Sequence, residues 1–126
     1  MVSTVPRKRI FYLNLLQIWL PIGAYVSILH RASGVLLGLS IPGLLWVWSV
    51  SLGSAEGFAS VQAMLRGGPG LLLGCVLLWA FLHHLLAGLR HLGFDLGWGE
   101  SRLAARRSAW LTLLLSVVIL LGLTLS

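Results

Sequence analysis

The stretch GGPGLLLGCVLLWAFLHHLLAGL, residues 67–89, contains no aspartate, glutamate, lysine or arginine. A helix needs about 20 apolar residues to cross the hydrocarbon core of a bilayer, so this stretch is long enough to span a membrane. Two further uncharged runs, 32–55 and 108–126, are also long enough, the second only just. The sequence therefore predicts an all-α integral membrane protein with three transmembrane helices.

The composition agrees with a membrane protein. Of the 126 residues, 58% are hydrophobic and 10% are charged, and the mean hydropathy is +0.95. A soluble domain carries roughly 25% charged residues. The net charge of +6 does not indicate a nucleic-acid partner, because the basic residues flank the apolar runs instead of forming a stripe. The single cysteine, Cys75, provides neither an intrachain disulfide nor a cysteine metal cluster.

A fourth uncharged run, 10–29, is interrupted by Pro21 and is separated from the next run by only two residues. No hairpin between two spans fits into that gap. We therefore expect residues 10–20 to form an interfacial N-terminal segment that lies along the membrane. The first span then begins near Pro21, because proline suits the first turn of a helix. The chain is expected to be one membrane-anchor domain, 1–126, with spans at about 22–53, 68–92 and 106–126.

The basic residues predict how the chain is oriented. Four of them precede the first span or lie near its start, and four lie around the loop after the second span. The loop between the first two spans contains only Arg66. Cytoplasmic loops carry the excess of lysine and arginine. The N-terminus and the second loop are therefore expected in the cytoplasm.

Histidines cluster where the second span ends, in AFLHHLLAGLRHLGFD, residues 80–95. An ionisable residue inside a membrane helix is costly and is a candidate for function. At about 100° per residue, His84, Gly88 and His91 share one face of the helix, whereas His83 points about 100° away. Glycine on that face leaves room for a flat ring or another helix, and imidazole is an axial ligand of haem iron. A histidine that only hydrogen-bonds a neighbouring helix fits the same pattern, so both interpretations stay open.

A second polar block, SILHRASG, occupies residues 27–34 near the start of the first span. Ser27 and Arg31 lie one turn apart on one helix face, and His30 flanks them. A guanidinium pairs well with carboxylates, such as the propionates of haem, and a serine hydroxyl can donate to a quinone carbonyl. The plain alternative is an arginine that extends to the lipid headgroups.

Together, the two blocks resemble the cytochrome b556 membrane-anchor subunit of succinate dehydrogenase, respiratory complex II. That family has Ser–x–x–His–Arg–x–Ser/Thr–Gly followed by His–x3–Gly–x–Arg–His–x3–Asp, and both patterns are present here, at 27–34 and 84–95. The resemblance covers essentially the whole chain. This chain differs from the family in its N-terminal segment, which reads RIFYLNLLQIWLP where many members carry a Pro–Leu–Ser–Pro–His type of sequence.

The resemblance implies specific roles. His84, which has the family spacing to Gly88, is one axial ligand of haem b, and a second membrane-anchor subunit supplies the other. Ser27 and Arg31 line the ubiquinone site, and His30 and Arg31 lie near the haem propionates. The partners implied are the flavoprotein subunit and the iron–sulfur subunit, which pass electrons to ubiquinone. This chain has no succinate site of its own, and the location implied is the bacterial inner membrane. The resemblance gives no role to His83, His91 or Asp95.

Three other functions make different demands on the sequence. The anchor of a fumarate reductase has an overlapping residue arrangement, and the direction of the reaction cannot be read from the sequence. A cofactor-free structural membrane subunit would not need His84 and Gly88 on one face. A proton-coupled transporter needs a carboxylate within a span, and the three acidic residues, Glu56, Asp95 and Glu100, fall outside the expected spans.

Overall fold

The computed structural model describes residues 20–125. In this range the chain forms α1 (Ile22–Gly53), α2 (Ala55–Arg66), α3 (Gly68–Asp95) and α4 (Arg102–Leu125), and no strand. Helices α1, α3 and α4 are long and apolar enough to cross a membrane. The predicted all-α class with three membrane helices is confirmed. The expected interfacial segment, 10–20, lies outside the described residues except for Leu20.

Helix boundaries follow from local chemistry. Pro21 adopts an extended conformation and precedes the first turn of α1, and a proline lies in the first turn of α3, where its missing N–H costs nothing. The connection from α3 to α4 turns at Gly97 and Gly99, whose φ angles are +77° and +73°; glycine adopts such angles without steric cost. Because a helix end does not mark the edge of the bilayer, the three expected span ranges stay predictions.

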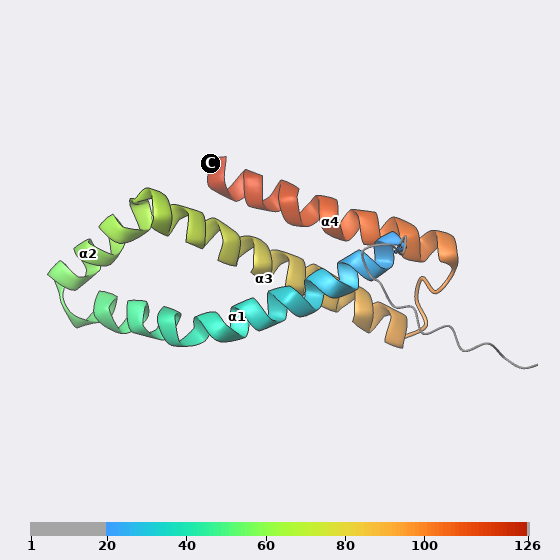
Figure 1. Ribbon diagram of the computed structural model, residues 1–126, viewed down its shortest axis with the longest axis horizontal. Coiled ribbons are helices and arrows are strands. Elements are labelled where there is room, and N and C mark those ends of the chain that lie inside the picture. The colour runs from blue at the N-terminus through green and yellow to red at the C-terminus, as the bar shows by residue number, and fades with distance from the viewer. Residues whose placement is uncertain (1–19, 126) are drawn as a thin grey trace, which may run out of the picture.

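The sequence predicts a loop between the first two spans, whereas the structure has helix α2 there. It is 12 residues long, too short to cross a membrane. Ser54 caps its N-terminus by accepting a hydrogen bond from the Gly57 N–H at 2.9 Å. Glu56 in the first turn and Arg66 in the last complement the helix dipole. Figure 1 shows α2 joining α1 to α3 at the end of the molecule opposite the α3–α4 connection.

The three long helices contact one another. In Figure 1, α1 crosses α3, so that the start of α1 lies beside α4. The fully buried apolar side chains are small: Val26, Ala80, Ala87 and Ala109. Small residues let membrane helices approach closely. Most leucines point outward, among them Leu39, which is 77% exposed. The surface is thus suited to lipid or to partner helices.

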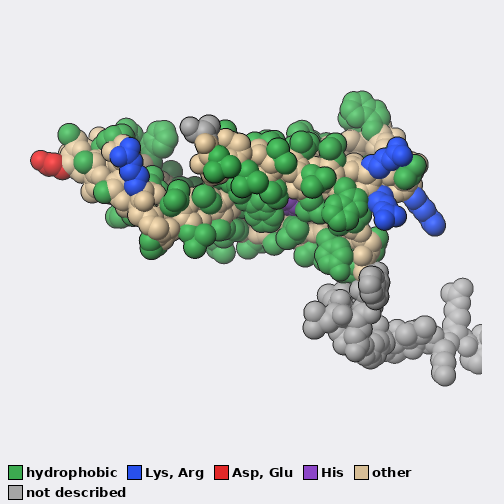
Figure 2. All heavy atoms as spheres, turned by 90° about the horizontal axis from the view of Figure 1, so that it is seen from above, with side chains coloured by type: hydrophobic (Ala, Val, Ile, Leu, Met, Phe, Trp, Pro, Cys, Tyr) green, Lys and Arg blue, Asp and Glu red, His purple; other side chains and the backbone are tan. Residues whose placement is uncertain are grey.

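Charge is segregated along the molecule. Figure 2 shows hydrophobic side chains over the long middle and basic side chains gathered at one end. We call this the basic end: it is where α1 begins, α3 ends and α4 begins. Arg66 lies at the opposite end, at the close of α2. The positive-inside rule predicts that the basic end faces the cytoplasm.

Candidate functional site

The two polar blocks of the sequence meet where α1 packs against α3. The Nδ1 atom of His84 lies 2.9 Å from the backbone carbonyl oxygen of His30 and 3.3 Å from the hydroxyl of Ser33. The Ser33 hydroxyl itself donates to the same carbonyl at 2.9 Å. A carbonyl oxygen only accepts hydrogen bonds, so Nδ1 of His84 carries the proton. In the neutral imidazole, Nε2 then holds the free lone pair.

The shared face of His84, Gly88 and His91 is occupied by the His30 ring from α1. The rings of His30 and His84 stack with centroids 4.2 Å apart and an interplanar angle of 17°. The ring of His91 lies 5.2 Å from that of His30. A Cβ atom at Gly88 would lie 3.5 Å from Nε2 of His30. The room that the sequence predicted beside Gly88 therefore holds an imidazole of this chain.

Gly34 and Ser33 shape the position of the His84 ring. A Cβ atom at Gly34 would lie 2.7 Å from Cε1 of His84, a distance at which the ring or the helix must move. Ser33 is buried and contacts Nδ1 of the ring as described above. The sequence does not predict that either residue contacts His84. It shows only that both belong to the block SILHRASG, residues 27–34.

His83 has a different environment from its neighbour. Its side chain is 0% exposed and stacks on Trp79 with centroids 5.3 Å apart. The backbone of Val26 lies near the ring, but neither nitrogen reaches hydrogen-bond geometry with any group in residues 20–125. In residues 20–125, the buried side-chain nitrogens without a hydrogen-bond partner are the two of the His83 ring, and Nε2 of His84 is not among them. His83 is therefore enclosed by its own chain, whereas His84 is only half-buried.

Ser27 and Arg31 lie on α1 beside His30. Arg31 is exposed and Ser27 is half-buried. In residues 20–125 no group of three or more histidine, cysteine or acidic side chains could hold a metal ion.

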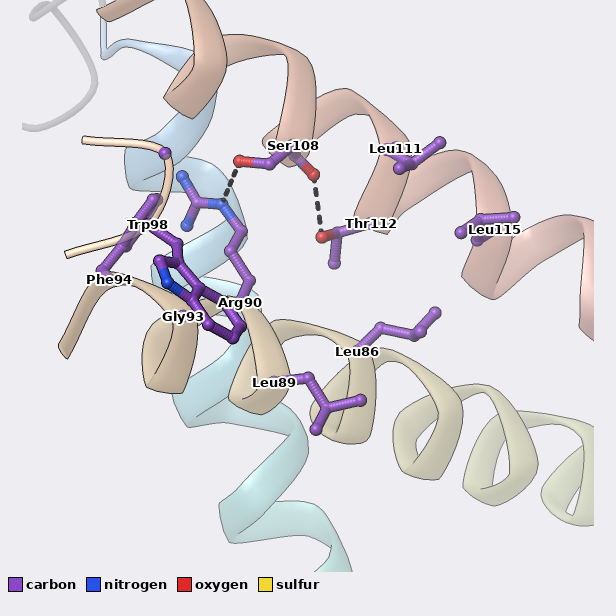
Figure 3. Close-up of a pocket in the computed structure, with 11 residues that line it drawn as sticks. Leu86, Leu89, Arg90, Gly93, Phe94, Trp98, Ser108, Leu111, Thr112 and Leu115 are labelled. Atoms are coloured by element: carbon purple, nitrogen blue, oxygen red, sulfur yellow. Dashed lines mark hydrogen bonds between the residues drawn. The ribbon is translucent and has the colours of Figure 1, made fainter. Parts of the chain in front are cut away.

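Arg90 connects α3 to α4 at the basic end. Its Nε donates to the Ser108 hydroxyl at 3.0 Å, and a terminal nitrogen donates to the Ala105 carbonyl at 3.2 Å. The guanidinium lies 4.5 Å from the centre of the Phe94 ring. Figure 3 shows Arg90 reaching from α3 to Ser108, beside a cavity of about 360 Å³ that leucines of both helices line. Arg90 belongs to the second sequence block, 84–95, but nothing in that block predicts its contact with α4.

The chain is similar to known proteins over most of its length. The family described as succinate dehydrogenase/fumarate reductase transmembrane subunit matches residues 6–123. A succinate dehydrogenase cytochrome b556 subunit of Coxiella burnetii is 38% identical, covering 88% of this chain and 90% of its own length. The subunit of the same name from Paracoccus denitrificans is 35% identical over 82% of this chain and 81% of its own. The subunit of the same name from Rickettsia bellii is 32% identical over 77% of this chain and 75% of its own length.

Proposed function

The chain belongs to the succinate dehydrogenase/fumarate reductase transmembrane subunit family, and we propose that it is the haem b- and quinone-binding anchor of a succinate:quinone oxidoreductase. It would hold the flavoprotein and iron–sulfur subunits at the bacterial inner membrane, together with a second anchor subunit. Relatives of similar length carry the name succinate dehydrogenase cytochrome b556 subunit, which supports this assignment.

One contact carries the haem proposal: the hydrogen bond from Nδ1–H of His84 to the His30 carbonyl. Metal-ligating histidines almost always donate their second ring N–H to a carbonyl, a carboxylate or water, which fixes the tautomer and the ring orientation. His84 has this arrangement, and its Nε2 is the free donor atom. When bound, a haem supplies one-electron redox chemistry. The second axial ligand would come from the second anchor subunit, since His83 is enclosed within its own chain.

The quinone proposal rests on the exposed side of α1. Arg31 is exposed although it lies nine residues into a membrane helix, and such a charge is costly unless it has a partner. A guanidinium can stabilise negative charge that develops on a quinone oxygen, and the Ser27 hydroxyl can donate to the same carbonyl. Together with His30, Arg31 would also pair with haem propionates. The chain thus contributes position and electrostatics, and succinate would be oxidised in the flavoprotein subunit.

The experiment that tests the function is a dithionite-reduced minus oxidised absorption spectrum of the protein, purified with the chains that accompany it. We expect a b-type haem signal, with flavin-bearing and iron–sulfur-bearing chains in the same sample. A spectrum without haem, from a sample that retains those chains, contradicts the haem proposal. A sample in which such chains never accompany the protein contradicts the anchor proposal.

The matched family also includes fumarate reductase subunits, so an anchor of a fumarate reductase is the second candidate. The two differ in the preferred direction of the reaction. Comparing succinate oxidation by ubiquinone with fumarate reduction by a reduced quinone, in the same purified complex, distinguishes them.

A further inference from the structure

A second cavity, of about 690 Å³, lies at the basic end between the start of α1 and the start of α4. Three arginines line it: Arg90 from α3, and Arg102 and Arg106 from α4. We call it the arginine groove. It is distinct from the His30–His84 contact, since neither histidine lines it. The question is which group balances three positive charges that share one groove at the end of a membrane bundle.

No carboxylate side chain lines the arginine groove in the described part of the chain, although Asp95 and Glu100 lie near the α3–α4 connection at the same end. The acidic residues of the sequence are Glu56, Asp95 and Glu100, so none lies in the first 21 positions or beyond Glu100. The Arg90 guanidinium donates to two neutral acceptors, the Ser108 hydroxyl and the Ala105 carbonyl. Because grouped like charges repel one another, the groove favours an anion from outside the chain.

The start of α1 adds to the same potential. Ile22, Gly23 and Ala24 line the groove. Pro21 provides no side-chain cap, and of these three residues Ala24 donates its N–H to the Pro21 carbonyl at 2.8 Å, which leaves the N–H groups of Ile22 and Gly23. Free N–H groups and the positive end of the helix dipole attract anions, phosphate in particular. A Cβ atom at Gly23 would lie 3.3 Å from a terminal nitrogen of Arg90, so the α1 backbone comes close to the guanidinium. The three arginines and the N-terminus of α1 therefore both favour an anion in the arginine groove.

The remaining lining indicates the kind of anion. Leu20 and Trp110 line the groove beside the arginines. Tryptophan next to basic residues at the end of a membrane helix is typical of the headgroup level of a bilayer. We propose that the arginine groove binds the phosphate headgroup of an anionic phospholipid, with Arg102 and Arg106 on the phosphate and Trp110 beside the glycerol region. This proposal does not depend on haem or quinone binding.

The test uses the purified full-length chain with its accompanying subunits, delipidated in detergent and titrated with phosphatidylglycerol or with phosphatidylcholine under native mass spectrometry. Arg106→Gln removes a groove charge. Arg107→Gln is the matched control, because it removes the same charge from the next residue of α4, which does not line the groove. We expect the wild type to prefer phosphatidylglycerol. Arg106→Gln should weaken that binding about fivefold and the Arg102→Gln/Arg106→Gln double variant more than about tenfold. Arg107→Gln should change it less than about twofold.

Three outcomes would overturn the proposal. Equal losses in Arg106→Gln and Arg107→Gln would mean diffuse attraction to the basic end. Binding of inorganic phosphate with the same affinity as phosphatidylglycerol would mean a soluble anion instead of a lipid. Loss of an accompanying subunit from the double variant, with phosphatidylglycerol binding unchanged, would mean that the groove holds an acidic segment of that subunit. All three arginine variants should melt within a few degrees of the wild type, since these side chains are exposed.

Discussion

The ring of His84 is held by the backbone of His30, because Nδ1 of the first lies 2.9 Å from the carbonyl oxygen of the second. The two sequence blocks are therefore parts of one arrangement. The first supplies a carbonyl, the Ser33 hydroxyl and the gap at Gly34. The second supplies the imidazole. With its Nδ1 proton donated to the carbonyl, that neutral imidazole has its lone pair on Nε2.

Replacing His84 by leucine should remove haem from the complex. A leucine has no lone pair for iron, and the remaining ligand from the second anchor subunit would hold the haem on one side only. We expect haem per complex to fall by at least about tenfold, as measured by the pyridine haemochrome assay on purified protein. The accompanying chains should be counted in the same sample, so that loss of haem is separated from loss of assembly.

His83→Leu is the adjacent control. His83 is fully buried with two unpaired ring nitrogens, and an unsatisfied buried polar atom costs about 1–3 kcal/mol. Leucine should therefore leave the thermal stability unchanged or raise it, and the haem content should equal that of the wild type. Equal loss of haem from His83→Leu and His84→Leu would contradict the assignment of His84.

Ser27→Ala and Arg31→Ala should impair quinone reduction while succinate oxidation with an artificial acceptor continues. Hydrogen bonds to charged groups contribute about 1.5–3 kcal/mol, so the loss of Arg31 should lower the quinone reductase rate by about tenfold or more. The measurement is the ratio of the two activities in one preparation. Arg66→Ala, at the opposite end of the molecule, is the control. If Arg31→Ala keeps both activities at wild-type levels, the quinone assignment is wrong.

The fold was largely predictable because a bilayer imposes a simple rule: a span must be uncharged over about 20 residues. That rule located α1, α3 and α4. It says nothing about α2, whose 12 residues carry Glu56 and Arg66 and whose start depends on the Ser54 cap. Such a cap is a short local signal, and the positions of the apolar runs do not reveal it.

The candidate site was predictable in part. Helical periodicity separates His83 from His84 by about 100°, and the structure gives them different environments. The contacts of His84 with His30 and Ser33 depend on the register between α1 and α3, which no local pattern encodes. The same holds for Arg90, whose partners Ser108 and Ala105 are 15 to 18 positions away in sequence. The contacts of His84 and Arg90 could therefore be found only from the way the helices pack in the structure.

Arg90→Gln should loosen the contact between α3 and α4. It removes a charged donor from the Ser108 hydroxyl and the Ala105 carbonyl, and we expect a loss of about 1.5–3 kcal/mol of stability. The readout is the melting temperature of the purified complex, with Arg107→Gln as the control for charge. Ser108→Ala should cost less, and adding it to Arg90→Gln should cost little more, because both remove the same hydrogen bond. Fully additive losses would contradict the contact.

Gly34→Ala tests the approach of α1 to His84 against a control in the same helix. Alanine favours a helix over glycine by about 1 kcal/mol, and this gain is the same at Gly34 and at Gly38. A Cβ atom at Gly38 meets nothing within 4 Å, whereas one at Gly34 would lie 2.7 Å from Cε1 of His84. Gly38→Ala should therefore leave the haem spectrum unchanged.

In Gly34→Ala the imidazole or helix α1 must shift, and we expect the Nδ1–H bond to the His30 carbonyl to lengthen. That bond makes the ring a more basic ligand, and a less basic ligand stabilises ferric haem less. We therefore expect the haem reduction potential of Gly34→Ala to rise relative to Gly38→Ala and the wild type, in a redox titration followed at the b-type band. If the potentials of all three agree, the His84 ring does not pack against Gly34, and the hydrogen bond on which the haem proposal rests must be abandoned with it.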